Sequence, residues 1–313
     1  MVEKTATTTA TTTTTAAATA KKSKSSTSQL VLTFQPIIAI IFGLITILYD
    51  GWFSSSSSNG SSHSSVICKV WGLAIICKSL FAYTARTFEL KERVVVCRCM
   101  VITYFVQAFV IFYEGQRKAS GVLDGLATSG LLISCIYTLA SFVLGSFENA
   151  FDKVDYSTTS SNDNKPFVLK LVILSQALMA IPVGVLSVLN PDGIYTIPKK
   201  MFPLLVLNVT TDPLEIFAIR CWGSFIFGFG MLCIHLFAVP EFSMTSMKTY
   251  GKVMIFYFST NTIPFLSQWN ELNIIYQYGS VPVFIIMAVL YSIAVLVTPD
   301  TTQEQQEQKL KKN

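Results

Sequence analysis

Long apolar stretches alternate with short polar segments along the chain, and eight of these stretches are long enough to cross a membrane as a helix. A helix needs about 20 mostly apolar residues to span the hydrocarbon core of a bilayer. The pattern therefore predicts an all-α polytopic membrane protein with about eight transmembrane helices. We place the spans at residues 30–49, 66–84, 94–113, 126–145, 166–190, 212–239, 251–268 and 281–297.

The eight spans fall into two groups of four with similar sequences. Lys69 comes two residues before a Trp-Gly pair in the second span, as Arg220 does in the sixth, and residues 39–43 resemble 180–184. Four spans per unit is an even number, so both units must enter the membrane from the same side, as in transporters with parallel repeats. Further matches in the same order pair residues 102–105 with 255–258 and residues 137–140 with 291–294.

This duplication sets the expected domain organisation. The Thr-, Ala- and Ser-rich N-terminal segment has too few apolar residues to offset the entropy of ordering, so we predict that it is disordered. The expected order is a disordered cytosolic tail (1–29), a four-helix membrane repeat (30–146), a cytosolic linker (147–165), a second four-helix membrane repeat (166–298) and a cytosolic tail (299–313).

Three short segments of the first unit carry a family resemblance: Lys-Val-Trp-Gly at 69–72, Tyr-Thr-Ala at 83–85 and Tyr-Phe-Val-Gln-Ala-Phe at 104–109. With them the unit resembles the DoxX-like four-helix membrane proteins and the related tumour-suppressor-inducible multi-pass family. The second unit has a similar helix at 219–223, followed by two glycines. Where such families tend to have Arg before the aromatic-Gly pair, the first unit has Lys69. The resemblance implies a four-helix fold for each half and no settled activity.

Composition and charge agree with a membrane protein. The chain is 51% hydrophobic and only 13% charged, whereas soluble domains have roughly a quarter of charged residues. Its net charge of +5 is spread over loops and tails, so we expect no nucleic-acid partner. With the N-terminus in the cytosol, fourteen bases lie on the inside and four on the outside. Both glycosylation sequons, at Asn59 and Asn208, then lie outside.

Two pairs of opposite charges lie at the expected outer ends of neighbouring spans. Asp50 follows the first span and Lys69 lies about one turn into the second, while Asp192 and Arg220 hold the matching places in the fifth and sixth. A base within an apolar helix is unfavourable unless it reaches water or meets an acid. We predict structural ion pairs Asp50–Lys69 and Asp192–Arg220, in preference to an anion-binding site.

Lys78 and Arg98 lie toward the cytosolic ends of the second and third spans, with no acid beside them in the membrane. Long basic side chains in such positions commonly extend to anionic lipid headgroups. We expect this arrangement for both, in preference to contact with a substrate.

The most polar segment near the middle of a span is residues 259–262, just before Pro264. A proline there frees a backbone carbonyl that neighbouring polar groups can satisfy. Hydrogen bonding within a packed bundle is the favoured structural explanation, and a ligand pocket is the functional one. If the segment forms a ligand pocket, the ligand-binding residues that we predict are Ser259, Thr260, Asn261, Thr262, Gln107, Gln176, Gly228 and Gly230.

The spans lack the residues that metal proteins and most membrane enzymes need. No Asp or Glu lies near the middle of a span, and the two histidines, His63 and His235, are far apart in the sequence. Cys97 and Cys99 have no second pair of ligands to complete a metal site. We therefore predict no catalytic residue, no metal and no cofactor.

These features favour a non-enzymatic membrane protein with a polar cleft at the midplane between two repeats, which carries or binds a small neutral or lipid-like molecule. Its expected partners are the lipid bilayer, that ligand, and another membrane protein or a second copy of the chain. A structural or assembly subunit of a membrane complex is the alternative. A membrane enzyme acting on a lipid or quinone ranks last, because no acid–base pair lies within the spans. The sequence does not separate the plasma membrane from endomembranes.

Overall fold

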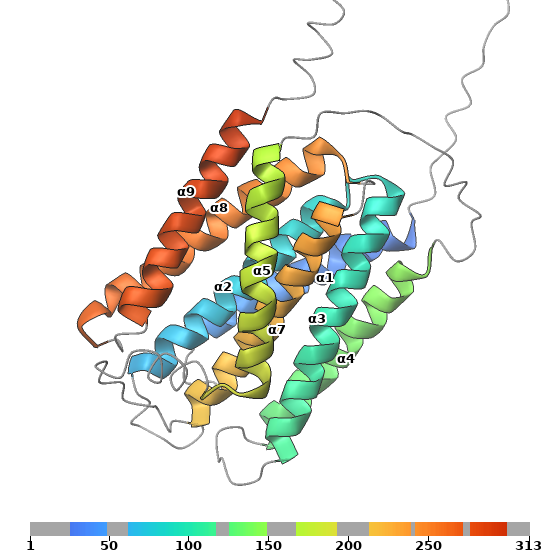
Figure 1. The fold of residues 1–313 in the computed structure, drawn as a ribbon. Helices are drawn as coiled ribbons and strands as arrows, with labels where there is room; N and C mark the ends of the chain where they lie inside the picture. The colour runs from blue at the N-terminus through green and yellow to red at the C-terminus, as the bar shows by residue number, and fades with distance from the viewer. Residues whose placement is uncertain are drawn as a thin grey trace, which may run out of the picture.

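The computed structural model describes residues 26–48, 62–116, 125–148, 167–192, 213–238, 242–271 and 276–298 (Figure 1). The regular structure in these ranges is helical, which confirms the all-α prediction for this part of the chain. The long helices are α1 (Thr27–Leu48), α2 (Ser62–Ala85), α3 (Leu90–Gln116), α4 (Gly125–Ser146), α5 (Phe167–Leu189), α7 (Pro213–Ala238), α8 (Met244–Ser267) and α9 (Val281–Val297). The short elements η3 (Trp269–Glu271) and η4 (Tyr276–Ser280) precede α9.

Seven helical segments are long and apolar enough to cross a membrane: α1, α2, α3, α4, α5, α7 and the segment formed by η4 and α9. Large apolar side chains are also exposed on the helix surfaces, including Phe34 on α1, Leu178 on α5 and Leu296 on α9. Such an extended apolar surface suits lipid rather than water. The chain is therefore a multi-pass membrane protein. α8 is not among the seven, so the described residues contain seven candidate spans, and an eighth span stays a prediction.

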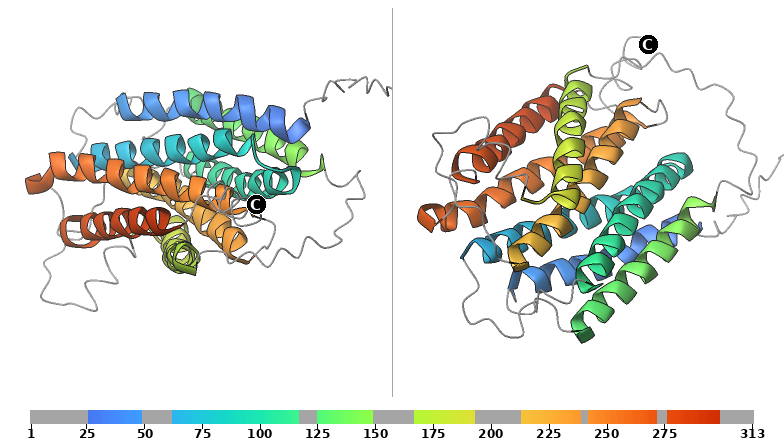
Figure 2. Two further views of the ribbon diagram at one scale, coloured as in Figure 1. Left: turned by 90° about the horizontal axis from the view of Figure 1, so that it is seen from above. Right: turned by 60° about the horizontal axis from the view of Figure 1, so that its bottom comes forward.

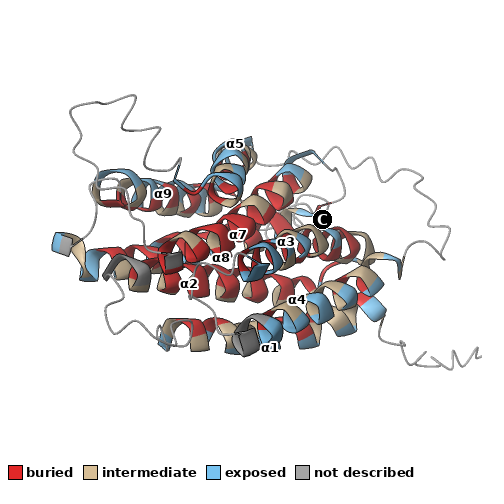
Figure 3. Ribbon diagram, turned by 90° about the horizontal axis from the view of Figure 1, so that it is seen from below, coloured by how far each residue is buried: buried red, intermediate tan, exposed pale blue. Residues whose placement is uncertain are grey.

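The helices divide into a central group and two outer pairs. In the view from above, α1 and α4 lie on one side and α5 and α9 on the opposite side, with α2, α3, α7 and α8 between them (Figure 2). The spanning parts of α2, α3 and α7 are 72, 67 and 61% buried, whereas those of α1, α4, α5 and α9 are 28 to 39% buried. Figure 3 shows the same contrast by colour. The central helices thus form the core, and the outer helices present one face to lipid.

Glycines allow the closest helix crossings. In the α1–α2 pair, Gly43 and Gly72 face each other. A Cβ atom added to either glycine would lie 2.8 Å from the carbonyl oxygen of the other. In the α5–α7 pair, one on Gly223 would lie 3.1 Å from the carbonyl oxygen of Gly184. Backbones can approach this closely only where side chains are absent.

Two carboxylates cap helices that are distant in sequence. Glu148, after α4, accepts hydrogen bonds from the backbone N–H groups of Thr27 and Ser28 at the start of α1, each at 3.0 Å. Glu92 of α3 accepts from the backbone N–H of Ser243, which precedes α8, at 2.6 Å. The first N–H groups of a helix have no partner within the helix, and a charged acceptor there is stabilising. These caps tie α1 to α4 and α3 to α8 at one end of the bundle.

Several helix boundaries differ from the sequence expectation. α1 begins at Thr27, inside the segment expected to be disordered, because Glu148 satisfies its first N–H groups. α3 and α8 begin at Leu90 and Met244, four and seven residues before the expected starts at 94 and 251. α7 begins at Pro213, one residue after the expected start of the sixth span at 212. Polar residues at helix ends extend a helix beyond its apolar stretch, so hydropathy alone gives helices that are too short.

Candidate functional site

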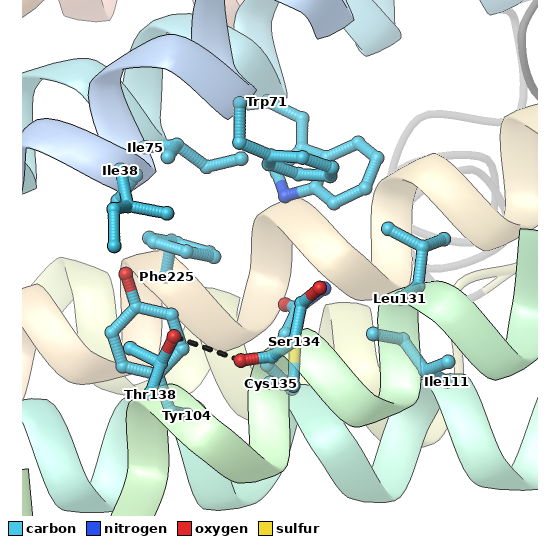
Figure 4. Close-up of a pocket in the computed structure, with 13 residues that line it drawn as sticks. Ile38, Trp71, Ile75, Tyr104, Ile111, Leu131, Ser134, Cys135, Thr138 and Phe225 are labelled. Carbon is cyan, nitrogen blue, oxygen red and sulfur yellow. Dashed lines mark hydrogen bonds between the residues drawn. The ribbon is translucent and has the colours of Figure 1, made fainter. Parts of the chain in front are cut away.

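A cavity of about 100 Å³ lies among α1, α2, α3 and α4, with one residue from α7 (Figure 4). Its wall is built mainly from apolar and aromatic side chains of helices that are distant in sequence. The lining residues are Ile38, Ala39, Phe42, Trp71, Ile75, Tyr104, Gln107, Ile111, Leu131, Ser134, Cys135, Thr138 and Phe225.

The polar groups of the wall come from α3, α4 and the indole N–H of Trp71 on α2. The hydroxyl of Thr138 donates to the carbonyl oxygen of Ser134 at 2.8 Å, so this donor is already used within α4 (Figure 4). The side-chain oxygen of Gln107 accepts a hydrogen bond from the hydroxyl of Ser224 on α7. The side chain of Gln107 also interacts with the thiol of Cys221, which is a weak acceptor. Gln107 therefore has donor capacity left for a ligand in the cavity.

The cavity opens toward the lipid-facing surface between α1 and α4. Ile38 of α1 lines it and is 53% exposed, and Ser134 of α4 lines it and is also exposed. A molecule could thus enter sideways from the bilayer without crossing the packed centre.

Lys78 does not line this cavity, but its Nζ lies 5.7 Å from the ring centre of the lining residue Phe225. On α2, Trp71, Ile75 and Lys78 share one face, and Lys78 is about one turn farther along the helix than Ile75. On α3, Thr103 adjoins the lining residue Tyr104, and its hydroxyl accepts a hydrogen bond from the Lys78 Nζ. Two helices of the cavity wall, α2 and α3, therefore also build the surroundings of Lys78.

The structure contradicts the expected extension of Lys78 to the lipid headgroups. Its side chain is only 1% exposed, and its Nζ lies 5.7 and 5.2 Å from the ring centres of Phe225 and Phe229 on α7. The stem turns inward because Gly228 has no side chain and leaves room for the ammonium group between α2, α3 and α7. Within the described ranges, no carboxylate lies within ion-pair distance of Lys78. Arg98, by contrast, is exposed.

Arg220 has a different acid partner from the one that we predicted. Its guanidinium lies 2.7 Å from a carboxylate oxygen of Glu114 on α3, with both side chains about one-tenth exposed, and 5.0 Å from the ring centre of Tyr113. Asp192 is exposed and does not pair with it. Glu114 belongs to a helix that packs directly against α7, so it meets Arg220 from the side. The predicted partner of Lys69, Asp50, lies outside the described residues, and that pair stays a prediction.

Only Gln107 of the predicted ligand residues lines the cavity. Gln176 lies in a separate buried network, where its side-chain oxygen accepts from the hydroxyls of Tyr250, at 3.2 Å, and Tyr291. Gly230 packs against α5, and Gly228 lies beside Lys78. The hydroxyls of Thr260 and Thr262 and the amide of Asn261 donate to carbonyl oxygens of their own helix, and Ser259 is exposed.

A shared ligand site for these eight residues therefore stays a prediction, and the cavity is a separate arrangement. Sequence reasoning missed its α4 wall, because Ser134, Cys135 and Thr138 are ordinary residues of an apolar stretch. It did single out Lys78, a base with no acid nearby, and the error lay in the direction of the side chain.

Other sequence predictions concern single residues. His235 is partly buried, with its Nδ1 2.8 Å from the carbonyl oxygen of Met231. The sequons at Asn59 and Asn208 lie outside the described residues. Among the residues that the structure describes, no group of three or more His, Cys, Asp or Glu side chains could hold a metal ion.

Comparisons with protein-family models, with curated proteins and with solved structures found no match. The fold and the cavity define a multi-pass membrane protein of helices, and its function must be inferred from the chemistry of its own residues.

Proposed function

We propose that this membrane protein binds a lipid-like molecule, which enters the cavity from the bilayer between α1 and α4. The observation that carries the proposal is a largely apolar cavity that holds one amide, Gln107, and opens at exposed residues of two lipid-facing helices. Ligand sites commonly combine an apolar wall with a few polar groups that fix orientation. A membrane-resident molecule reaches this opening without passing through water.

The size of the cavity also favours a ligand that extends out of it. A closed apolar cavity of about 150 Å³ holds a molecule of the size of benzene. A space of about 100 Å³ thus accepts a small head and several carbon atoms. The rest of an alkyl chain would leave past Ile38 and Ser134 and lie among the lipids. A water-soluble solute would gain nothing from that exit.

The test uses a long-chain fatty alcohol with a photoreactive diazirine in its chain, added to the protein in phosphatidylcholine nanodiscs. Cys135→Phe fills the cavity, and Ala140→Phe adds the same ring to an exposed position of the same helix. We expect labelling of cavity residues to fall about tenfold in the first variant, equivalent to about 1.4 kcal/mol, and to stay unchanged in the second. Equal labelling of both variants and the wild type would refute the proposal.

We also propose that the chain is a duplication of a four-helix unit, α1–α4 and α5–α9. The support comes from the helix crossings. Gly43 and Gly72 meet at the α1–α2 crossing, and their aligned counterparts Gly184 and Gly223 meet at the α5–α7 crossing. Both units also have a hydroxyl side chain three residues after the glycine of their first helix, Gly43 or Gly184. Thr46 donates to the carbonyl oxygen of Phe42, and Ser187 donates to that of Val183.

The helix neighbours agree with such a duplication. α2 packs on α7 at the centre, α2 packs on α8, and α3 packs on α7. If α2 corresponds to α7 and α3 to α8, the last two contacts are equivalent. The resemblance to DoxX-like units is part of the same proposal, because it too concerns a four-helix unit.

In this arrangement α8 is the eighth span and both termini are cytosolic. α8 has 24 residues and is about 36 Å long, enough for a bilayer. Polar side chains near its middle donate to backbone carbonyl oxygens of the same helix, as the Asn261 amide does to Tyr257 at 2.7 Å. Addition of glycan at Asn59 and Asn208 in microsomes would support this orientation, and modification of a Cys placed at either terminus by an outside reagent would contradict it.

A further inference from the structure

We infer that the ligand of the cavity is a monocarboxylate with an apolar chain, and that its carboxylate pairs with Lys78. The inference rests on the proposed function, since it names the chemical class of the molecule that the cavity takes. It adds Lys78, which does not line the cavity, as a binding residue.

The hydrogen bonds of Lys78 are incomplete. An ammonium group has three N–H donors. The hydroxyl of Thr103 accepts one of them, and this hydroxyl gives its own proton to the carbonyl oxygen of Cys99 at 2.9 Å. In the described part of the chain, Lys78 has no other acceptor. A fully buried cation with two unsatisfied donors can take an anionic group with two oxygens.

The other neighbours of Lys78 are neutral. They are the rings of Phe225 and Phe229 and the thiols of Cys99 and Cys233. Charged groups within membranes usually pair with one another or mark a ligand path. Here the single positive charge matches one carboxylate, whereas a phosphate monoester with two negative charges would bring an unpaired charge into an apolar site.

Phe225 separates the cavity from Lys78. Its ring lines the cavity (Figure 4), and the centre of the same ring lies 5.7 Å from Nζ. The next turn of α7 carries Gly228, and the place that a side chain would take there is filled by Nζ and the hydroxyl of Thr103. In the proposed complex the carboxylate head takes the place of the Phe225 ring and so comes within reach of Nζ. The alkyl chain of the ligand would then lie against Ile75 and Ile38 and leave between α1 and α4.

The experiment compares three probes of equal chain length and with the same diazirine: a fatty acid, a fatty alcohol and an alkyl phosphate. Labelling and competition are measured in phosphatidylcholine nanodiscs. We expect the wild type to bind the acid at least about tenfold more tightly than the alcohol. We expect the phosphate to bind more weakly than the acid. Phosphate binding as tight as that of the acid would overturn the assignment of a monocarboxylate.

The variant Lys78→Met keeps the length of the stem and removes the charge. We expect it to lose the preference for the acid and to keep the affinity for the alcohol. Its matched control is Lys252→Met, which removes an exposed base from α8 and should leave both affinities unchanged. Because an apolar replacement removes a buried charge, Lys78→Met should melt at the same temperature as the wild type or higher. If Lys78→Met retained the preference for the acid, the inference would be wrong.

The wild-type comparison decides the question even if a variant fails to fold. Equal binding of acid and alcohol would reject the role of Lys78 and leave the lipid-binding proposal standing. Binding of neither probe would reject both. Labelling by the acid that Cys135→Phe does not reduce would place the acid elsewhere and would also reject the inference.

Discussion

Gly72→Ala is the substitution for which the structure gives the most direct prediction. A methyl group at this position would lie 2.8 Å from the carbonyl oxygen of Gly43 and 2.8 Å from a side-chain carbon of Ile47. The first of these atoms belongs to the backbone of α1, so it cannot move aside as a flexible side chain does. α1 and α2 would have to separate along the crossing.

The size of the effect follows from two opposing contributions. Extra carbon atoms in a well-packed interface cost about 1–3 kcal/mol. Replacing glycine by alanine within a helix contributes about 1 kcal/mol in the other direction. Gly130→Ala on α4 provides the matched control, because no atom lies within 4 Å of a methyl group there. The intrinsic helix preference cancels between the two variants, so Gly72→Ala should be less stable than Gly130→Ala by about 1–3 kcal/mol.

The measurement is reversible unfolding of both variants and the wild type in the same detergent micelles, followed by helix content. Gly130→Ala should match or exceed the wild-type stability, and Gly72→Ala should fall below its control. The reasoning would be refuted if the two alanine variants had equal stability. Gly223→Ala should behave like Gly72→Ala if α5 and α7 cross in the same way as α1 and α2.

Two further predictions concern buried charges. Glu114→Leu and Arg220→Met should each destabilise the protein by about 3–5 kcal/mol, because each leaves one charge buried alone, whereas the double variant should be close to the wild type in a melting experiment. A double variant as unstable as either single one would contradict this account of the pair. Glu92→Ala should cost about 1–2 kcal/mol and raise amide hydrogen exchange at the start of α8, because the N–H of Ser243 loses its charged acceptor. Glu89→Ala, at an exposed position nearby, should leave that exchange unchanged.

The sequence determined the class of the protein and the position of its helices. Apolar length indicates membrane spans because the thickness of the bilayer sets a minimum number of residues, and this rule needs no knowledge of neighbours. The same rule failed for the ends of helices. Thr27 and Met244 begin helices outside the apolar stretches because Glu148 and Glu92, which are far away in the sequence, assist in capping them.

Only the tertiary structure decided the partners of the charged and polar side chains. Arg220 was expected to meet Asp192 of the preceding span and instead meets Glu114, because α7 packs on α3 as well as on α5. Lys78 was expected to point toward lipid headgroups and instead points into the junction of α2, α3 and α7, where Gly228 leaves space. A hydropathy pattern records how apolar each residue is along one helix. The direction of a long side chain depends on which helix lies opposite, and that is set by packing between segments far apart in the chain.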